Sequence, residues 1–165
     1  MAYSFVELSS SINRKDFLSR SKELNEYFKQ FASQDQKRGL AKCYVLISDK
    51  NETVGYYTIS ASSVLLTSFP KIVQKRVSYK VLPVALIGRL AIDKKFEGKG
   101  FGSILIYDAI ERVKKNVLAV AAVIVTAKDN KASNFYKHLG FIPFDSLIND
   151  KETLFYPLSK VFNTI

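Results

Sequence analysis

One continuous stretch of the chain decides its fold. It reads Val84-Ala85-Leu86-Ile87-Gly88-Arg89-Leu90-Ala91-Ile92-Asp93-Lys94-Lys95-Phe96-Glu97-Gly98-Lys99-Gly100-Phe101-Gly102-Ser103. The first part, Val84 to Ile92, is a mostly apolar run that only Gly88 and Arg89 interrupt, and such a run is typical of a central strand buried on both faces. The second part, Asp93 to Gly100, is polar and contains glycine, which predicts a turn.

An amphipathic helix is expected to follow this turn and to continue to about Lys115. One side of the helix is apolar and consists of Leu105, Ile106, Ala109, Ile110 and Val113. The other side is polar and consists of Ser103, Asp108, Glu111, Arg112 and Lys114. The sequence therefore predicts a buried strand, a glycine-bearing turn and an amphipathic helix, in that order.

Upstream of this stretch, the apolar spacing predicts a helix and a hairpin. The helix is indicated by an i, i+3, i+4, i+7 pattern at Leu24, Tyr27, Phe28 and Phe31. Two apolar runs, Cys43 to Ser48 and Thr53 to Ser60, are separated by turn-forming residues, which favours an antiparallel hairpin. Pro70 is expected at the first position of a short helix.

Downstream of the central stretch, expected strands again alternate with a helix. Ala121 to Ala127 predicts a second buried strand, and Lys131 to Leu139 a short helix that ends at Gly140. Two further strands are expected at Phe141 to Phe144 and Thr153 to Tyr156. Helices and strands that alternate in this order indicate an α/β fold, with a mixed sheet and helices on both of its faces.

Length and composition set the class of protein. The chain has 165 residues, of which 47% are hydrophobic, so we expect one domain over residues 1–165 with a substantial core rather than a disordered chain. The start of the chain lacks the pattern of a signal peptide, and the longest apolar run, Val117 to Val125, is too short to span a bilayer. We therefore expect a cytoplasmic protein without a membrane partner. The single cysteine, Cys43, is expected to be a buried, inert thiol.

The net charge points to polyanionic partners. With 25 basic and 15 acidic residues, the chain carries +10, which suits RNA, DNA, an acidic protein or a phosphorylated cofactor. The alternative is a basic surface exposed only to solvent. Four basic residues cluster before the central strand, Lys71, Lys75, Arg76 and Lys80, and Lys37 and Arg38 lie earlier. These six are the candidates for contacts to an RNA backbone.

The three glycines of the turn predict a phosphate site. Gly98, Gly100 and Gly102 stand between a strand and a helix, where the first N–H groups of the helix lack partners and its dipole is positive. Glycine lets a phosphate approach this backbone closely, and Lys95 and Lys99 add positive charge. The alternative is a purely structural turn.

Two common phosphate loops are excluded. The chain lacks the G-x-x-x-x-G-K-[ST] pattern of a P-loop. A dinucleotide-binding fold expects an acidic residue about 20 positions after its glycines, but Ala119 to Val123 contains no carboxylate. The remaining candidate is the pyrophosphate of coenzyme A.

Two motifs resemble the GNAT superfamily of N-acetyltransferases. The stretch from Val84 to Asp93, followed by Gly98 to Ser103, resembles the acetyl-CoA motif of that superfamily. The later Asn130-Lys131-Ala132-Ser133-Asn134-Phe135-Tyr136, followed by Gly140-Phe141, is similar to its second cofactor motif. Lys95 and Lys99 depart from the usual residues, as does Phe101 in place of leucine, but none of the three removes a backbone donor.

This resemblance implies an acetyl-CoA-dependent N-acetyltransferase with a mostly antiparallel sheet whose central strand pair is splayed. Acetyl-CoA would be a co-substrate, and no metal is implied. The cofactor-binding residues would be Leu90, Ala91, Ile92, Lys95, Gly98, Lys99, Gly100, Phe101, Gly102, Ser103 and Asn134. Backbone N–H groups of the strand from Leu90 to Ile92 would stabilise the oxyanion. Tyr136 would protonate the departing thiolate; from the residues alone, packing against the sheet is the alternative for it.

The N-terminal part resembles one branch of the superfamily, the tRNA-acetylating toxins of bacterial toxin–antitoxin pairs. The matching segments are Ser33 to Arg38, Cys43 to Leu46 and Gly55 to Val64. The resemblance implies an enzyme that acetylates the α-amine of aminoacyl-tRNA and blocks translation, a ribbon-helix-helix antitoxin and a homodimer. The alternative is an N-acetyltransferase that acts on a small amine or a protein N-terminus, without a toxin role. A coenzyme A- or RNA-binding protein without turnover is a third reading.

The sequence offers no clear general base. His138, the only histidine, is expected to be exposed or capping near a helix C-terminus, and Glu97 is expected to shape the turn. An α-amine titrates near 7.7–8.0, and an adjacent ester lowers this value, so a charged tRNA would arrive with much of its amine already neutral. Arg89 has no assigned role: it either pairs with a carboxylate or reaches tRNA or cofactor.

Overall fold

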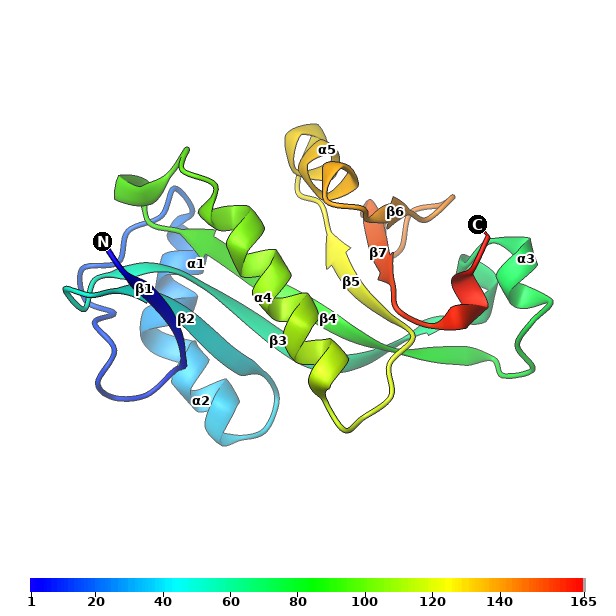
Figure 1. Cartoon of the computed structure of the whole chain (residues 1–165), viewed down its shortest axis with the longest axis horizontal. Helices are drawn as coiled ribbons and strands as arrows, with labels where there is room; N and C mark the ends of the chain where they lie inside the picture. Colours follow the sequence, from blue (N-terminus) through cyan, green and yellow to red (C-terminus); the bar gives the residue numbers. More distant parts are fainter. Residues whose placement is uncertain (165) are drawn as a thin grey trace. The chain divides into compact units, whose positions relative to one another are not determined.

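The strand, turn and helix predicted from the central stretch are present. A computed structural model describes residues 1–164. In it the central strand β4 covers Val81–Ile92, the 3-10 turn η3 covers Lys94–Phe96, and helix α4 covers Phe101–Lys115 (Figure 1). Asp93 caps η3, because its side chain accepts a hydrogen bond from the N–H of Lys95.

Within residues 1–164, seven strands form one sheet in the order β1-β2-β3-β4-β5-β7-β6. Besides β4, the strands are β1 (Tyr3–Glu7), β2 (Lys42–Ser48), β3 (Thr53–Leu65), β5 (Ala122–Thr126), β6 (Ile142–Pro143) and β7 (Thr153–Pro157). The pairs β1–β2, β2–β3, β5–β7 and β6–β7 are antiparallel, whereas β4 and β5 are parallel from Val84↔Ala122 to Leu86↔Ile124. The mixed, mostly antiparallel sheet is therefore confirmed, and the splay of the central strands remains a prediction.

The helices lie close to their predicted positions. They are α1 (Lys22–Glu26), the π-helical turn η1 (Tyr27–Phe31), α2 (Ala32–Lys37), α3 (Lys71–Gln74), α5 (Asn130–His138) and the 3-10 turns η2 (Leu66–Ser68) and η4 (Lys160–Phe162). Pro70 stands one position before α3 as its N-cap residue rather than at the first helical position. Gly140 follows α5 with a φ of 101°, as expected for a residue that ends a helix.

The π-helical turn corrects one core prediction. Phe31 was expected on the apolar stripe with Leu24, but its side chain is 49% exposed, and Ala32 is buried in its place. The reason is the wider i→i+5 turn, in which the N–H of Ala32 donates to the carbonyl of Tyr27. This extra residue rotates the following chain and moves Phe31 off the stripe.

The described part of the chain, residues 1–164, forms two compact units. The first consists of residues 1–60 and 87–109. Neighbouring residues of β3 point to opposite faces of the sheet. Tyr56 stacks on Phe28 at 4.4 Å between ring centroids, and Tyr57 donates to the carboxylate of Asp108 on α4. Helices α1 and α2, with η1, therefore cover one face of this unit and the start of α4 covers the other (Figure 1).

Cys43 lies in the core of this first unit, on the side of Tyr56. Its side chain is buried, and burial raises the pKa of the thiol to about 12. The burial predicted for this cysteine is therefore confirmed, and a raised pKa disfavours the reactive thiolate.

The second unit consists of residues 61–86 and 110–165 and has an aromatic core. Phe69 contacts Phe144, Phe155 and Phe162 at 5.0 to 5.5 Å between centroids. Tyr156 follows Phe155 on β7 and therefore points to the opposite face, where it contacts Phe141 at 5.4 Å. Both units thus have packed side chains on two faces of their strands, as the sequence predicts.

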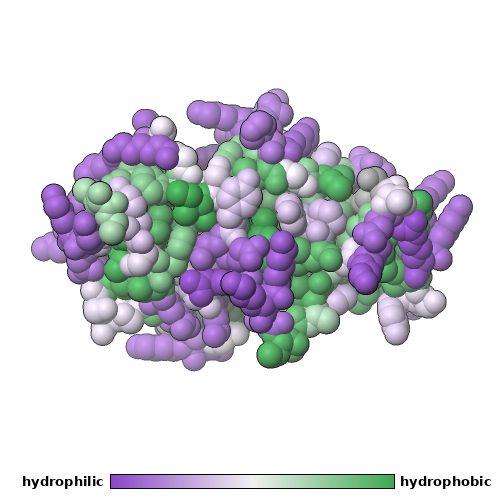
Figure 2. Space-filling model, in the orientation of Figure 1, coloured by the Kyte–Doolittle hydropathy of each residue, from purple (hydrophilic) through white to green (hydrophobic). Residues whose placement is uncertain are grey.

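The apolar run from Val117 to Val125 divides into two parts. Ala121 to Val125 is buried, whereas Val117 is 98% and Leu118 67% exposed in the loop between α4 and β5. Hydrophobic atoms are visible at the lower edge of Figure 2, where this loop lies. Within residues 1–164, no helix is long and apolar enough to cross a membrane.

Candidate functional site

The glycine turn has a backbone that requires glycine. Gly98 has a φ of 73° and Gly100 a φ of 82°, in the left-handed region that other L-residues seldom adopt. A Cβ built at either position meets nothing within 4 Å. The outer side of the turn is therefore open. Glycine is needed at these two positions because of the positive φ, and not because a side chain would meet neighbouring atoms.

The start of α4 presents unpaired backbone donors. The N–H of Ile104 donates to the carbonyl of Gly100 at 3.4 Å, and among residues 1–164 no acceptor is present for the N–H groups of Phe101, Gly102 and Ser103. A helix of 15 residues places the positive end of its dipole at these donors. Free N–H groups at the positive end of a helix dipole suit a phosphate group, and the phosphate site at this turn remains a prediction.

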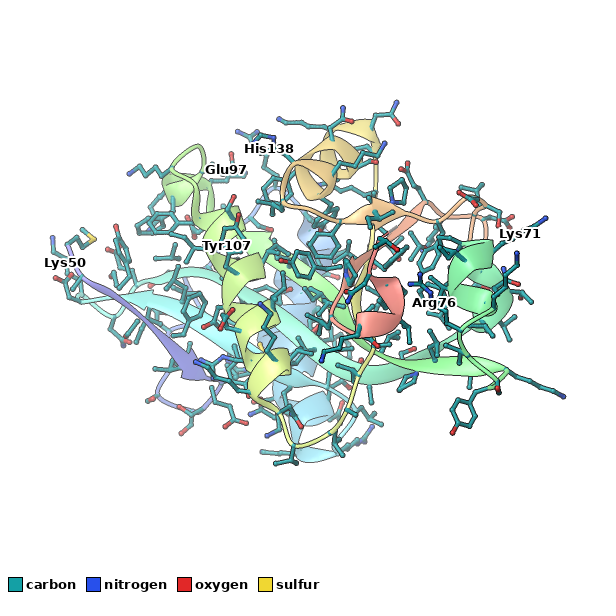
Figure 3. The ribbon with its side chains drawn as sticks, turned by 45° about the vertical axis from the view of Figure 1, so that its right-hand side comes forward. Lys50, Lys71, Arg76, Glu97, Tyr107 and His138 are labelled. Carbon is teal, nitrogen blue, oxygen red and sulfur yellow. The ribbon has the colours of Figure 1, made fainter. Side chains whose placement is uncertain are left out.

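Two carboxylates, Asp93 and Glu97, hold the turn in place by accepting hydrogen bonds. Asp93 is only 2% exposed, and its two carboxylate oxygens accept from the N–H groups of Lys95 and Leu18, both at 2.9 Å. At the far end of the turn, the Nε atom of Arg20 donates to both oxygens of Glu97 at 3.0 and 2.8 Å (Figure 3). Glu97 therefore shapes the turn, as expected, by anchoring it to the N-terminal segment.

The lysine side chains of the turn are exposed, whereas the side chain of Phe101 is buried. Lys95 is exposed, and its ammonium forms an ion pair with Glu52 at 3.2 Å. The ammonium groups of Lys95 and Lys99 lie 5.9 and 5.8 Å from the ring centroid of Phe96. Phe101 is buried and contacts the rings of Tyr3 and Phe96 edge-on. Only the backbone of Phe101 is therefore accessible to a ligand.

The strand from Leu90 to Ile92 leads directly into the turn. Ala91 belongs to the buried core on the Tyr56 side, whereas Leu90 and Ile92 are partly buried. Gly55 on β3 lies directly beside this strand: a Cβ at Gly55 would come within 2.7 Å of both the carbonyl oxygen of Ala91 and a methyl group of Ile92.

Replacing Gly55 with alanine is expected to destabilise the protein by about 1–3 kcal/mol, because the strand has to move away from the new methyl group. Thermal unfolding would show a melting temperature lowered by several degrees. Gly88→Ala is the matched control, since a Cβ there meets only the hydroxyl of Thr58 at 3.4 Å. Equal melting temperatures for the two variants would contradict the expected crowding.

Arg89 interrupts the apolar strand and stacks on an aromatic ring. Its guanidinium carbon lies 3.8 Å from the ring centroid of Tyr27, whose hydroxyl donates to the carboxylate of Asp35 at 2.8 Å. Within residues 1–164, no carboxylate forms an ion pair with Arg89 and no acceptor takes a hydrogen bond from it. The carboxylate pairing left open by the sequence is therefore absent from the described chain.

Tyr136 lies on α5 in the second unit, in an aromatic environment. Its ring is 5.4 Å from Phe135 and 5.6 Å from Phe141 between centroids. Burial raises the pKa of the Tyr136 phenol above its usual value of 10.0, because the phenolate loses its hydration. The group is therefore protonated throughout the neutral range, as a proton donor requires.

The hydroxyl of Tyr136 differs from those of three buried tyrosines. Tyr27, Tyr56 and Tyr57 donate to Asp35, to the carbonyl of Leu24 and to Asp108 respectively. No acceptor within residues 1–164 binds the hydroxyl of Tyr136. A buried tyrosine normally satisfies its hydroxyl, so this donor is available to a ligand. The lack of an acceptor depends on tertiary packing, and no sequence pattern indicates it.

The remaining residues of the second motif lie on the same short helix. Asp129 caps α5 by accepting from the N–H of Ala132 at 2.7 Å, and buried Ser133 donates to Glu152 at 2.6 Å. Asn134 is exposed. His138 is exposed in the last turn, as predicted (Figure 3). Within residues 1–164, no cluster of three or more metal-binding side chains is present.

Comparison with known families agrees with these features. The profile of the Acetyltransferase (GNAT) family matches residues 5–141. The chain belongs to this family and is an acyltransferase. It is also 32% identical, over 136 residues, to a tRNA-acetylating toxin of Mycobacterium tuberculosis, a match that covers 81% of each chain.

Solved structures share the whole fold. The structure of AtaT complexed with acetyl-methionyl-tRNAfMet is 27% identical, with a TM-score of 0.86, and the match covers 94% of this chain and 95% of that one. AtaTR bound with acetyl-CoA is also 27% identical, with a TM-score of 0.80, covering 96% of this chain and 95% of the other.

Proposed function

We propose that this chain transfers an acetyl group from acetyl-CoA to the α-amine of aminoacyl-tRNA and thereby acts as a toxin that blocks translation. The observation that carries the proposal is the likeness, over nearly the full chain, to AtaT complexed with acetyl-methionyl-tRNAfMet. The 32% identity to a tRNA-acetylating toxin supports it independently. Since an acetylated α-amine cannot form a peptide bond, the acetylated aminoacyl-tRNA could not take part in elongation.

Acetyl-CoA would bind at the glycine turn of the first unit. The unpaired N–H groups of Phe101, Gly102 and Ser103 would hold the pyrophosphate, and Lys95 and Lys99 would add positive charge. The strand from Leu90 to Ile92 would direct backbone N–H groups at the thioester carbonyl and stabilise the oxyanion. Asn134 would contact the cofactor from α5. The open outer side of the turn supports this assignment.

Tyr136 would protonate the departing thiolate of coenzyme A. The amine attacks the thioester carbonyl, the tetrahedral intermediate collapses with cleavage of the C–S bond, and the phenol proton moves to sulfur. The amine loses its own proton to solvent, which then restores the phenol. A neutral phenol whose hydroxyl has no acceptor among the described residues, 1–164, supports this role.

Basic residues of the second unit would contact the RNA backbone. This unit has twelve basic and five acidic residues, a net charge of +7 out of +10, and residues 61–86 contain no acidic residue. Lys71, Lys75 and Lys80 are exposed, whereas Arg76 donates to the carbonyls of Val161 and Asn163 at 3.0 and 2.7 Å (Figure 3). The lysines are therefore the better candidates for phosphate contacts.

The biological setting follows from this substrate. We place the reaction in the cytoplasm, where charged tRNA and acetyl-CoA occur together, and assign residues 1–165 to one N-acetyltransferase domain. A toxin made by its own host requires control, so an antitoxin of the ribbon-helix-helix class and a homodimeric enzyme are further parts of the proposal. Growth arrest on expression, relieved by a gene encoded beside this one, would support the antitoxin.

The decisive experiment incubates the protein with radiolabelled acetyl-CoA and a pool of tRNA charged with all amino acids. We expect label on the amino acid of at least one charged tRNA, and none on uncharged tRNA. Small amines, polyamines and peptides with free N-termini are the parallel acceptors. Acetylation of these acceptors, with none on charged tRNA, would contradict the proposal.

The rate should depend on pH through the acceptor and not through Tyr136. With charged tRNA, kcat/KM is expected to rise between about pH 6 and 8 as the α-amine loses its proton, and then to level off. A falling limb requires ionisation of Tyr136, whose pKa is raised above 10.0, so none is expected up to about pH 9.5. A decline that begins below about pH 9 would assign the proton donor to a different group.

A further inference from the structure

Arg89 has a feature that the proposed acetyl transfer does not use. It is a partly buried cation in an apolar strand, and within residues 1–164 its guanidinium has neither a counter-charge nor a hydrogen-bond acceptor. A cation removed from water usually has a partner. Its nitrogen atoms retain contact with solvent, because no buried side-chain nitrogen of the described residues lacks a partner. The donors of Arg89 are therefore accessible to a ligand.

The guanidinium of Arg89 is held against an aromatic ring. It lies on the ring of Tyr27 at 3.8 Å, and Tyr27 is fixed in turn by its hydrogen bond to Asp35 at 2.8 Å. Stacking on an aromatic face leaves the edges of a guanidinium free to donate. Those edges form a rigid fork that matches two oxygens of a phosphate. The chemistry of the site is therefore that of an oxyanion receptor, and phosphate fits it well.

The position of Arg89 distinguishes between two sources of phosphate. Its side chain lies with Tyr27 on the face covered by η1. The glycine turn leads into α4, and α4 covers the opposite face, where Leu105 approaches Gly55. A coenzyme A pyrophosphate at the start of α4 and an anion at Arg89 therefore belong to opposite faces of the first unit.

We propose that Arg89 binds the phosphodiester at the 3′ end of the acceptor RNA, next to the nucleoside that carries the amino acid. This proposal rests on the proposed function and names one of the contacts that recognise its substrate. Arg89 is a positioning residue: it takes no part in bond making, and places the ester-linked amine beside the strand from Leu90 to Ile92.

The test compares two acceptors that carry the same amino acid. One is the charged tRNA identified in the pool assay, and the other is the aminoacyl ester of adenosine, which has no phosphate. For Arg89→Gln we expect kcat/KM on charged tRNA to fall by about 10- to 100-fold, mostly through KM, and to change less than about threefold on the adenosine ester. Arg89→Lys should lie between, because it keeps the charge and loses the fork.

Salt dependence and a matched arginine complete the design. Removing one contact to a single-stranded phosphate should lower the slope of log KM against log salt by about 0.7. Arg14→Gln is the control, since Arg14 lies in the same unit and donates to the carbonyl of Phe28 at 3.3 Å. It removes the same charge and should leave the preference between the two acceptors unchanged.

Three results would contradict the proposed contact of Arg89 with the RNA phosphate. Equal losses of Arg89→Gln on both acceptors, or no loss on either, would overturn the phosphate contact while leaving aminoacyl-tRNA acetylation intact. A raised KM for acetyl-CoA would assign the contact to the cofactor instead. A wild-type protein that acetylates no charged tRNA would overturn the proposed function and this contact together.

Discussion

Replacing Tyr136 with phenylalanine is expected to lower kcat by about 100-fold, the effect of losing a general acid that assists departure of the leaving group. Burial keeps the phenol of Tyr136 protonated, and its hydroxyl has no acceptor within residues 1–164. The variant therefore removes a proton donor without breaking an internal hydrogen bond. Single-turnover acetylation of charged tRNA would measure the chemical step directly.

The same variant should leave folding and cofactor binding intact. Since no protein partner of the hydroxyl is lost, the melting temperature and the Kd for acetyl-CoA are expected to match those of the wild type. Tyr156→Phe is the matched control, because Tyr156 contacts the same ring, Phe141, at 5.4 Å and has no assigned role. Unchanged turnover in Tyr136→Phe, or an equal loss in Tyr156→Phe, would remove Tyr136 from the mechanism.

The local part of the fold could be predicted from the sequence because it depends on spacing along the chain. The continuous apolar run from Val84 to Ile92 indicates a buried strand, and the apolar stripe of α4 has helical spacing. The glycines between them indicate a turn. Strand β1 was missed because a strand of five residues at the edge of the sheet is too short to show a clear alternation of apolar and polar residues. The π-helical turn was missed because the i, i+3, i+4, i+7 pattern assumes a regular α-helix.

The candidate site was predictable only in part, for a similar reason. Gly98 and Gly100 could be recognised because glycine is the residue type that most readily adopts a positive φ. The lack of a protein acceptor for the Tyr136 hydroxyl within residues 1–164, and the contact of Arg89 with Tyr27, depend on which side chains meet in three dimensions. The sequence therefore identified the residues of the cofactor motif, whereas the free hydrogen-bond donors of Tyr136 and Arg89 became visible only in the folded chain.

Replacing Gly100 with alanine is expected to raise the KM for acetyl-CoA by about tenfold or more. Alanine at a φ of 82° costs about 1–2 kcal/mol, so the turn relaxes and the N–H groups at the start of α4 lose their common direction. A phosphate held by two or three such donors loses more than one hydrogen bond to a charged group, each contributing about 1.5–3 kcal/mol. Steady-state kinetics with acetyl-CoA varied would measure the change.

Gly39→Ala separates this loss of binding from the general cost of the substitution. Gly39 follows α2 with a φ of 72° and, like Gly100, has nothing within 4 Å of a built Cβ. Both variants should therefore lose about the same free energy of unfolding, about 1–2 kcal/mol, yet only Gly100→Ala should raise the KM for acetyl-CoA. A raised KM in both would mean that stability limits cofactor binding. An unchanged KM in Gly100→Ala would mean that the turn is structural, the alternative that its sequence left open.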